Sequence, residues 1–343
     1  MNTSNSIILI LFFYTSLFSQ IPSGYYNDAE NTSEQELKAA LHNIIDNHQT
    51  YNYSSTTDIL RESDVDPNDQ RNVILIYSGE SVDAEDDYPG VWNKEHVWPR
   101  SRGDFGYSPP EGSDVHNLRA CNGSINSSRS NHNFDYCTNG CNNLNAGSSY
   151  NNTSKIFEPR DEDKGDVARI IFYMDVRYDG SSGELDLEMT ESLLSKSSKA
   201  PRHAVRSTLL AWHDLDPVDD FERYRNDVIY DYQGNRNPFI DYPELVHHLW
   251  GDKQNQNWSS SLSVSLVRED EIFIPNPIKT EYLNLESDIN FSKVELFNMQ
   301  GKTIRQLSGY VNRIEMPTSS GIYFLKLHYG NSVILRKFIV SSF

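Results

Sequence analysis

The chain has 343 residues, of which 37% are hydrophobic and 12% aromatic, and its formal net charge is −19. This composition excludes a disordered chain, because the apolar content is enough for at least one ordinary core and indicates two domains. The negative charge argues against a surface that binds anions everywhere, since nucleic-acid binders usually carry a basic footprint. From residue 269 onward, eight Lys and Arg balance eight Asp and Glu, so the acidic excess lies upstream.

The N-terminal segment, residues 1–20, contains an apolar run over residues 7–13. This run has the length of a signal-peptide core and is too short to span a bilayer. Because no Lys or Arg precedes it and no A-x-A follows, a buried N-terminal helix is the alternative. We expect a signal peptide over residues 1–20, and no stable membrane insertion, since no later stretch reaches transmembrane length.

Residues 21–251 have the pattern of a helix-rich α+β domain. Ser33-Glu-Gln-Glu36 spells a capping box, and apolar residues then recur at helical spacing as far as Ile45. Residues 73–77 are largely β-branched or apolar and predict a buried strand. Further helices are predicted, between turn signals, over residues 165–178, 209–212, 221–232 and 243–250.

The composition changes after residue 251. Residues 252–273 begin with a polar stretch and are predicted to be a linker. The remaining segment, residues 274–343, alternates short strands with turn signals and predicts a small all-β sandwich. Its expected strands cover residues 282–285, 294–298, 303–306, 322–327 and 333–340.

The three cysteines, Cys121, Cys137 and Cys141, lie close together in the sequence. An odd number in an exported protein leaves one thiol unpaired. One interpretation is a local disulfide plus a buried thiol. The other is a structural zinc site completed by His116 or His132, although C-x-x-x-C is a weak metal spacing.

The segment from residue 91 to residue 131 combines groups that carry chemistry. Glu95 and His96 are neighbours, and at a strand end both side chains can reach one cavity. Asp114-Val-His-Asn-Leu118 follows, and then Asn126 and Arg129, which would share a face of a helix. A solvated Glu-His pair and a core histidine at His116 are the structural alternatives.

Hydrolysis of a phosphodiester needs a base, a divalent ion and cations that hold the backbone. His96 is a candidate base, and Glu95 with Asn126 would form an oxygen-only site that suits Mg²⁺ or Ca²⁺. Basic residues near these blocks predict a local basic patch on an acidic body, with salt-sensitive binding. They are Arg100, Arg102, Arg119, Arg129, Arg160, Lys164 and Arg169.

The blocks N-K-E-H-V-W-P, D-V-H-N-L and N-S-S-R-S-N, followed by F-E-P-R-D-E-D-K-G-D-V-A-R, resemble the endonuclease I family over about residues 25–250. The resemblance implies a ββα-metal motif and a secreted or periplasmic, sequence-nonspecific nuclease that cuts DNA, and often RNA, to fragments with 5′-phosphates. It implies His96 as general base and Glu95 and Asn126 as ligands of one Mg²⁺, Ca²⁺ or Mn²⁺. The family's phosphate-holding arginine has no clean counterpart, so Arg100, Arg102 and Arg129 are candidates.

The tail resembles the C-terminal sorting domain of the type IX secretion system, on I-P-N-P, V-E-L-F-N and S-G-I-Y-F-L-K. This resemblance implies that the secretion machinery is a partner and that the protein, which we expect to be a monomer, is extracellular or at the cell surface. The alternative is an accessory β-sandwich that binds substrate.

Two other functions compete with the nuclease. A cell-surface binding module, stabilised by calcium in acidic loops such as residues 83–87, would have no need of His96. A zinc metallopeptidase would need H-E-x-x-H, which the sequence lacks, and His247-His248 has the wrong spacing.

Overall fold

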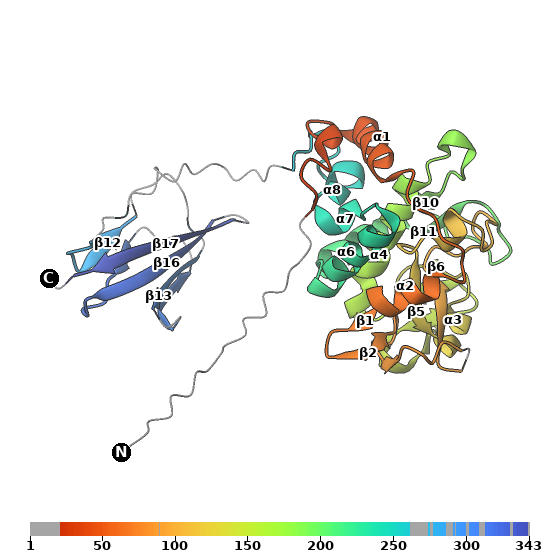
Figure 1. Cartoon of the computed structure of the whole chain (residues 1–343), viewed down its shortest axis with the longest axis horizontal. Helices are drawn as coiled ribbons and strands as arrows, with labels where there is room; N and C mark the ends of the chain where they lie inside the picture. Colours follow the sequence, from red (N-terminus) through yellow and green to blue (C-terminus); the bar gives the residue numbers. More distant parts are fainter. Residues whose placement is uncertain are drawn as a thin grey trace, which may run out of the picture. The chain divides into compact units, whose positions relative to one another are not determined.

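The computed structural model describes residues 21–88, 90–260, 274, 277–285, 291, 293–299, 302–308, 313–329 and 332–341. The predicted signal peptide, residues 1–20, and residues 261–273 of the predicted linker lie outside the described residues. The chain divides after Ser260 into two compact units, which are treated separately below (Figure 1). Within the described residues, no helix combines the length and the apolar character needed to cross a bilayer.

Helices form most of the core of the first unit. The central helix is α4, in which every residue is buried, and α1, α5 and α7 pack against it (Figure 1). The helices are α1 (Glu34–Ile45), α2 (Thr56–Ser63), α3 (Gly123–Arg129), α4 (Lys164–Arg177), α5 (Arg206–Leu215), α6 (Asp220–Gln233), α7 (Pro238–Asp241) and α8 (Leu245–Trp250). Short 3₁₀ turns cover Asn27–Ala29, Glu111–Ser113, Asn145–Gly147, Asp161–Asp163 and Ser181–Gly183.

Four small sheets complete the first unit. One is β1 (Val65–Asp66), β2 (Asp69–Ile74) and β3 (Ser81–Asp83), and another is the antiparallel pair β4 (Trp92–His96) and β5 (Leu118–Asn122). A third runs in the order β6 (Asn133–Phe134), β9 (Ile156–Glu158), β8 (Ser149–Asn151) and β7 (Asn142–Asn143). The fourth pairs β10 (Glu188–Thr190) with β11 (Arg202–Val205) in parallel.

The predicted helices are present in this unit, and two local predictions need correction. The strand expected over residues 73–77 is β2 and ends at Ile74, because the backbone of Tyr77 turns with φ 72°. Helix α1 begins at Ser33 without the predicted capping box: Glu34 has φ 51°, and the Ser33 side chain makes no capping hydrogen bond. The capping box lies instead at Asp219 and Glu222, at the start of α6.

The linker prediction also begins too early. Trp258 is 1% exposed within the core of the first unit, and Ser260 donates a hydrogen bond to Glu30. Residues 252–260 therefore belong to the first unit. The polar composition suggested a linker because most of this segment lies at the surface. The buried indole ring of Trp258 anchors the segment to the first unit.

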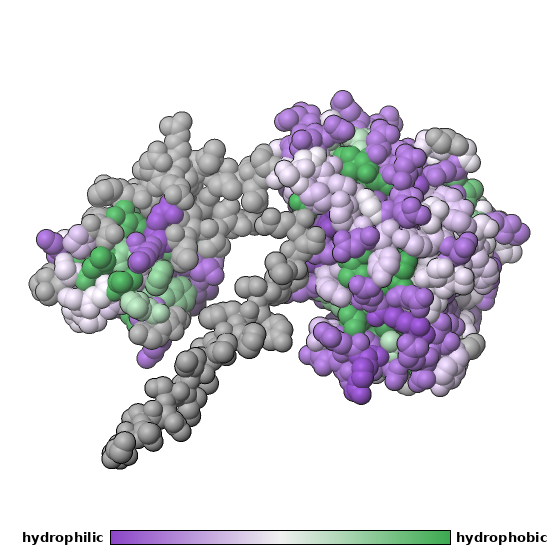
Figure 2. All heavy atoms as spheres, in the orientation of Figure 1, coloured by the Kyte–Doolittle hydropathy of each residue, from purple (hydrophilic) through white to green (hydrophobic). Residues whose placement is uncertain are grey.

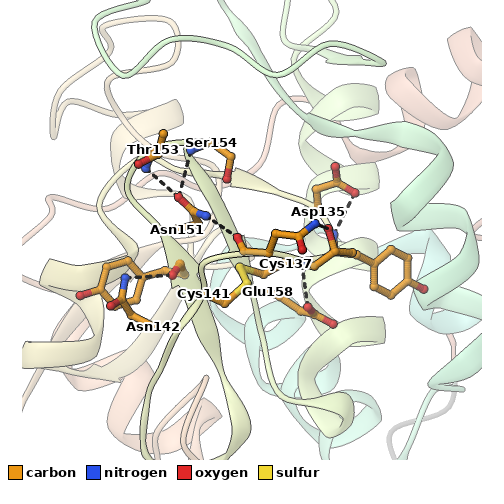
Figure 3. Close-up of a disulfide and its surroundings, with 12 residues drawn as sticks. Asp135, Cys137, Cys141, Asn142, Asn151, Thr153, Ser154 and Glu158 are labelled. Atoms are coloured by element: carbon orange, nitrogen blue, oxygen red, sulfur yellow. Dashed lines mark hydrogen bonds between the residues drawn. A yellow bond between two sulfur atoms is a disulfide. The ribbon is translucent and has the colours of Figure 1, made fainter.

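The cysteines follow the first of the two interpretations. Cys137 and Cys141 form a disulfide beside Glu158, whose carboxylate accepts a hydrogen bond from the Cys137 amide (Figure 3). Cys121 is a free, buried thiol. The zinc alternative is wrong, because the disulfide removes two of its ligands.

The second unit is a two-sheet β structure, as predicted. Strands β14 (Thr303–Ser308), β13 (Lys293–Asn298), β16 (Gly321–Tyr329) and β17 (Ser332–Val340) form one antiparallel sheet, and β12 (Tyr282–Asn284) pairs with β15 (Arg313–Glu315) in the other. Leu283 and Ile314 from the small sheet share a core with Leu296 and Leu325 from the large one. Strand β15 was not predicted.

Hydrophilic side chains cover most of the visible face of the first unit, with small apolar areas between them (Figure 2). A surface of this kind is ordinary for a globular domain. The charged side chains inside this unit are less ordinary, because a buried charge must be paired. They decide which cations remain available at the site.

Candidate active site

The site is built on a ββα unit formed by β4, β5 and α3. The two strands pair with Glu95 opposite Arg119 and His96 opposite Leu118. The Asn122 side chain then caps α3 by accepting hydrogen bonds from the amides of Ser124 and Ile125 at 3.0 and 3.3 Å. This cap turns the chain from strand into helix and returns α3 across β4.

Asn126 and Arg129 share the face of α3 that contacts β4, as their spacing predicted. Asn126 Nδ2 donates to the Lys94 carbonyl at 3.3 Å, and Arg129 Nε lies 3.1 Å from Glu95 Oε1. Glu95, His96 and Asn126 all line one pocket of about 710 Å³ at the end of β4. The structure therefore brings the three predicted residues together.

His96 is oriented from two sides. Its Nε2 lies 2.9 Å from the Gly112 carbonyl oxygen, which only accepts hydrogen bonds, so the proton of the neutral ring is on Nε2 and Nδ1 keeps its lone pair. The ring of Tyr53 stacks parallel to it, with centroids 5.4 Å apart. Burial, reinforced by the charges of Arg100, Lys94 and Arg129, lowers the pKa of His96 to about 4. The ring is therefore neutral, and able to act as a base, at ordinary pH.

Gly112 can approach His96 only because it has no side chain. A Cβ at this position would lie 2.5 Å from the backbone carbon of Tyr107. The carbonyl that sets the tautomer of His96 therefore depends on a close backbone contact. Neither Gly112 nor Tyr53 was predicted as a site residue, because nothing in their local sequence links them to His96.

Glu95 is buried but held by a hydrogen bond and an ion pair. The Tyr77 hydroxyl and Arg129 Nε both contact its Oε1, at 3.0 and 3.1 Å. Burial raises the pKa of Glu95 to about 7, and Arg129 and Tyr77 oppose that shift. A carboxyl in this position is easily ionised by a cation placed beside it.

The donor set of the pocket fits a hard divalent ion. Asn126 uses its amide nitrogen toward Asn93 Oδ1, at 2.7 Å, and toward Lys94, so its oxygen is the atom left for a ligand. In the described part of the chain, no group of three or more His, Cys, Asp or Glu side chains is placed to hold a metal. One carboxylate and one amide oxygen suit an ion such as Mg²⁺ that keeps several waters.

The predicted basic patch is wrong, because most of its arginines are buried and paired. Arg102 is fully buried and donates to the backbone of Ser195, Ser198 and Asn131, and Arg129 is fully buried against Glu95. Arg100 is exposed and lines the pocket. Of the three candidate arginines, Arg100 alone is placed to meet a substrate phosphate.

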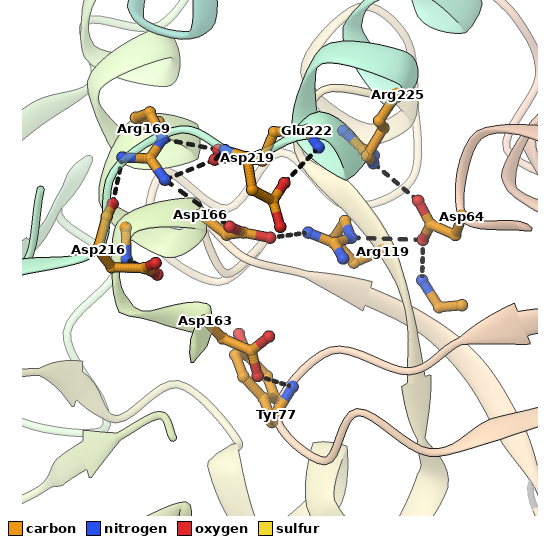
Figure 4. A network of polar contacts seen from close by, with 12 residues as sticks. Asp64, Tyr77, Arg119, Asp163, Asp166, Arg169, Asp216, Asp219, Glu222 and Arg225 are labelled. Carbon is orange, nitrogen blue, oxygen red and sulfur yellow. Dashed lines mark hydrogen bonds and ion pairs between the residues drawn. The ribbon is translucent and has the colours of Figure 1, made fainter. Parts of the chain in front are cut away.

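The remaining basic residues pair with acidic ones behind β5. Asp64 contacts Arg225 at 2.7 Å and Arg119 at 3.4 Å, and Arg119 also reaches Asp166 at 3.0 Å (Figure 4). Arg169 forms two hydrogen bonds of 2.6 Å with Glu222. We call Asp64, Arg119, Asp166, Arg169, Glu222 and Arg225 the buried ionic network.

The block over residues 157–169 thus supports the site from outside the pocket. Asp163 accepts a hydrogen bond from the Tyr77 amide at 2.8 Å (Figure 4). Arg160 donates to the same carboxylate. Tyr77 in turn holds Glu95. His116, which the sequence left between ligand and core, is 1% exposed and contacts Asn235 and Tyr173 outside the pocket.

Two family models match parts of this chain. The family model described as Endonuclease I matches residues 33–244, and the secretion system C-terminal sorting domain matches residues 272–341. The chain is 45% identical over 235 residues to an extracellular ribonuclease of Bacillus subtilis (strain 168), covering 66% of this chain and 78% of that protein. It is 43% identical over 255 residues to an extracellular ribonuclease of Bacillus amyloliquefaciens, covering 69% and 84%.

A third relative, an Endonuclease-1 of Buchnera aphidicola subsp. Baizongia pistaciae (strain Bp), is 30% identical over 140 residues, covering 40% of this chain and 49% of that protein. The tail is a sorting domain for type IX secretion, so the nuclease is secreted. The chain belongs to the endonuclease I family.

Proposed function

We propose that this chain is a divalent-metal-dependent endonuclease that hydrolyses DNA and RNA without sequence specificity. The observation that carries the proposal is the tautomer of His96: its Nε2 proton is directed at Gly112, so the basic Nδ1 is available in a pocket shared with Glu95 and Asn126. The relatives named as extracellular ribonucleases support RNA as one of the substrates.

In the proposed reaction, His96 Nδ1 takes a proton from the attacking water as the oxygen bonds to phosphorus. The bond from phosphorus to the 3′ oxygen breaks, the leaving oxygen takes a proton from solvent, and the products are a 5′-phosphate and a 3′-hydroxyl. Glu95 and Asn126 would hold the ion, which we propose to be Mg²⁺, with Ca²⁺ or Mn²⁺ as alternatives. A bound ion supplies charge neutralisation at the phosphate and the leaving oxygen.

The arginines divide between two roles. Arg100 is exposed at the pocket and would pair with the substrate phosphate. Arg129 has no exposed surface and contacts Glu95, so we assign it to positioning that carboxylate. Arg129 was a candidate for the phosphate contact from the sequence, and the positioning role now takes the place of that expectation.

The test is cleavage of circular DNA and of RNA by the purified chain, with Mg²⁺ and with excess EDTA. We expect cleavage of both substrates with Mg²⁺, loss of cleavage with EDTA, and fragments whose 5′-phosphates are removed by phosphatase. Asn126→Ala and Glu95→Gln should each raise the Mg²⁺ concentration at half-maximal rate. Full activity in EDTA, or unchanged Mg²⁺ titrations in both variants, would contradict the metal site.

The calcium-stabilised binding module is not supported. Calcium scaffolding takes six to eight oxygen ligands, about the number that several carboxylates supply. No group of three or more acidic or histidine side chains is placed to hold a metal among the described residues.

A further inference from the structure

Aromatic rings extend from the proposed base to the surface along one wall of the pocket. Tyr53 stacks on His96 with an interplanar angle of 8°, and the ring of Tyr107 lies 4.5 Å from that of Tyr53. Tyr107 is also 5.9 Å from His96, and the guanidinium carbon of Arg100 lies 4.4 Å from the Tyr107 centroid. The base, two aromatic rings and the exposed cation are therefore contiguous.

Two tyrosines that line the pocket are unusually exposed. Tyr107 is 48% exposed and Tyr88 is 51% exposed, and both line the pocket. They are the two most exposed tyrosines among those whose side chains the structure describes. Tyr88 has no aromatic partner among the described residues. Two large rings held open at a catalytic pocket indicate a ligand with flat apolar faces.

The charges of the pocket point the same way. Lys94 already donates hydrogen bonds to the Tyr53 carbonyl and to Thr57, and Asp87 also lines the pocket. Arg100 is thus the cation left for phosphate, and one such contact gives little sequence-independent affinity. Stacking of bases on aromatic side chains supplies affinity that does not depend on sequence.

We propose that Tyr107 and Tyr88 form a stacking subsite for unpaired nucleobases beside the scissile phosphate, so that single-stranded nucleic acid is the preferred substrate. The inference rests on the proposed nuclease function and extends it to a substrate class. Bases in a duplex are already stacked on their neighbours, and using them here would require unpairing. Arg100, placed over Tyr107, sets the phosphate contact next to the stacked base.

The experiment compares kcat/KM for one oligonucleotide as a single strand and as a duplex, with saturating Mg²⁺. The nucleic acid is DNA or RNA, whichever the wild type cuts faster, with one cleavable linkage among nuclease-resistant ones. The variants are Tyr107→Ala, Tyr88→Ala and Tyr107→Phe. The matched control is Tyr224→Ala, a tyrosine of α6 that is 38% exposed and lies outside the pocket lining.

We expect Tyr107→Ala and Tyr88→Ala each to lower single-strand kcat/KM by roughly tenfold or more, mainly through KM, and to lower duplex kcat/KM much less. Tyr107→Phe should restore the single-strand preference, because the ring is kept, and Tyr224→Ala should behave as wild type. If Tyr107→Ala fails to fold because it loses its contact with Tyr53, Tyr88→Ala still decides, since that ring contacts no other ring.

A second substrate tests the stacking directly. Removing the base next to the cleavable linkage should lower kcat/KM of the wild type. In an alanine variant that has lost the stacking ring, removal of the same base should lower kcat/KM by a smaller factor. Wild-type cleavage with equal single-strand and duplex losses in both alanine variants would overturn the subsite while leaving the nuclease intact. A wild type that cuts neither form with Mg²⁺ would instead overturn the proposed function.

Discussion

The pocket and the buried ionic network both draw residues from the strand pair β4 and β5, and they use charged residues in opposite ways. In the network, each guanidinium lies between 2.6 and 3.4 Å from a carboxylate. In the pocket, Arg100 has no acidic partner, and Nδ1 of His96 has no hydrogen-bond partner among the described residues. Burial decides between these uses. A charge without water must be paired, whereas a charge at the solvent-exposed pocket can remain unpaired until a substrate binds.

The comparison changes what is expected of salt. A patch of many arginines predicted a steep loss of cleavage as salt rises. With Arg102, Arg129 and the network arginines committed to protein partners, few counterions are released on binding, and the slope should be shallow. Counting charges in the sequence does not distinguish arginines that are free to bind phosphate from arginines that are paired within the protein.

The largest expected effect lies in the pocket. His96→Ala should lower kcat by about 10²–10⁴, since that is the usual cost of losing a general base. Its matched control is His116→Ala, another buried histidine that lies outside the pocket and should keep its rate per folded molecule. Single-turnover cleavage with folding checked by circular dichroism measures both. A His96→Ala rate within threefold of wild type would remove His96 from the mechanism.

A substitution in the buried ionic network should lower the stability of the fold and leave the catalytic rate nearly unchanged. Asp64→Asn keeps the shape of the side chain but leaves Arg119 and Arg225 facing each other, at a cost of about 3–5 kcal/mol in the free energy of unfolding. Denaturant unfolding measures this loss, and kcat of the folded fraction should change little. Asp58→Asn is the control, because its ion pair with Arg61 is exposed and contributes little.

Tyr77 joins Glu95 to Asp163, and loss of its hydroxyl should act on metal binding. Tyr77→Phe removes the hydroxyl that contacts Glu95, and loss of such a support usually costs about 10–100-fold in metal affinity. The Mg²⁺ dependence of the rate measures it. Tyr178→Phe removes a similar buried hydroxyl, from Asp114, and should leave the Mg²⁺ dependence unchanged. Equal responses of the two variants would show that Tyr77 is structural only.

The smallest effect is in the pH profile. A histidine with the usual pKa near ~6.5 would slow the enzyme below about pH 6, whereas burial lowers the pKa of His96 to about 4. With saturating Mg²⁺, the rate should therefore hold down to about pH 5. At low Mg²⁺ an earlier fall is expected, because burial raises the pKa of Glu95 to about 7 and its protonated form does not bind the ion. A profile independent of Mg²⁺ concentration would contradict the role of Glu95.

Much of the framework follows from local patterns. Helix α4 is legible from its apolar spacing, and the strands of the tail from their alternation. The order of Glu95, His96 and Asn126 along the chain placed all three in one pocket, because a strand pair followed by a capped helix brings them together. Because these three residues belong to consecutive elements, few other arrangements of them are possible.

The sequence by itself thus indicated two domains, and its resemblance to a family implied the ββα unit and pointed to the three residues that line one pocket beside it. Only the tertiary structure decided which arginine faces the pocket, which nitrogen of His96 is basic, and that Tyr53, Tyr77 and Gly112 support the site. Tyr53, Tyr77 and Gly112 lie in turns, where no periodicity or spacing links them to Glu95 or His96. Whether a charged side chain forms an ion pair within the protein or stays available to a substrate depends on its burial, which is a property of the packed chain.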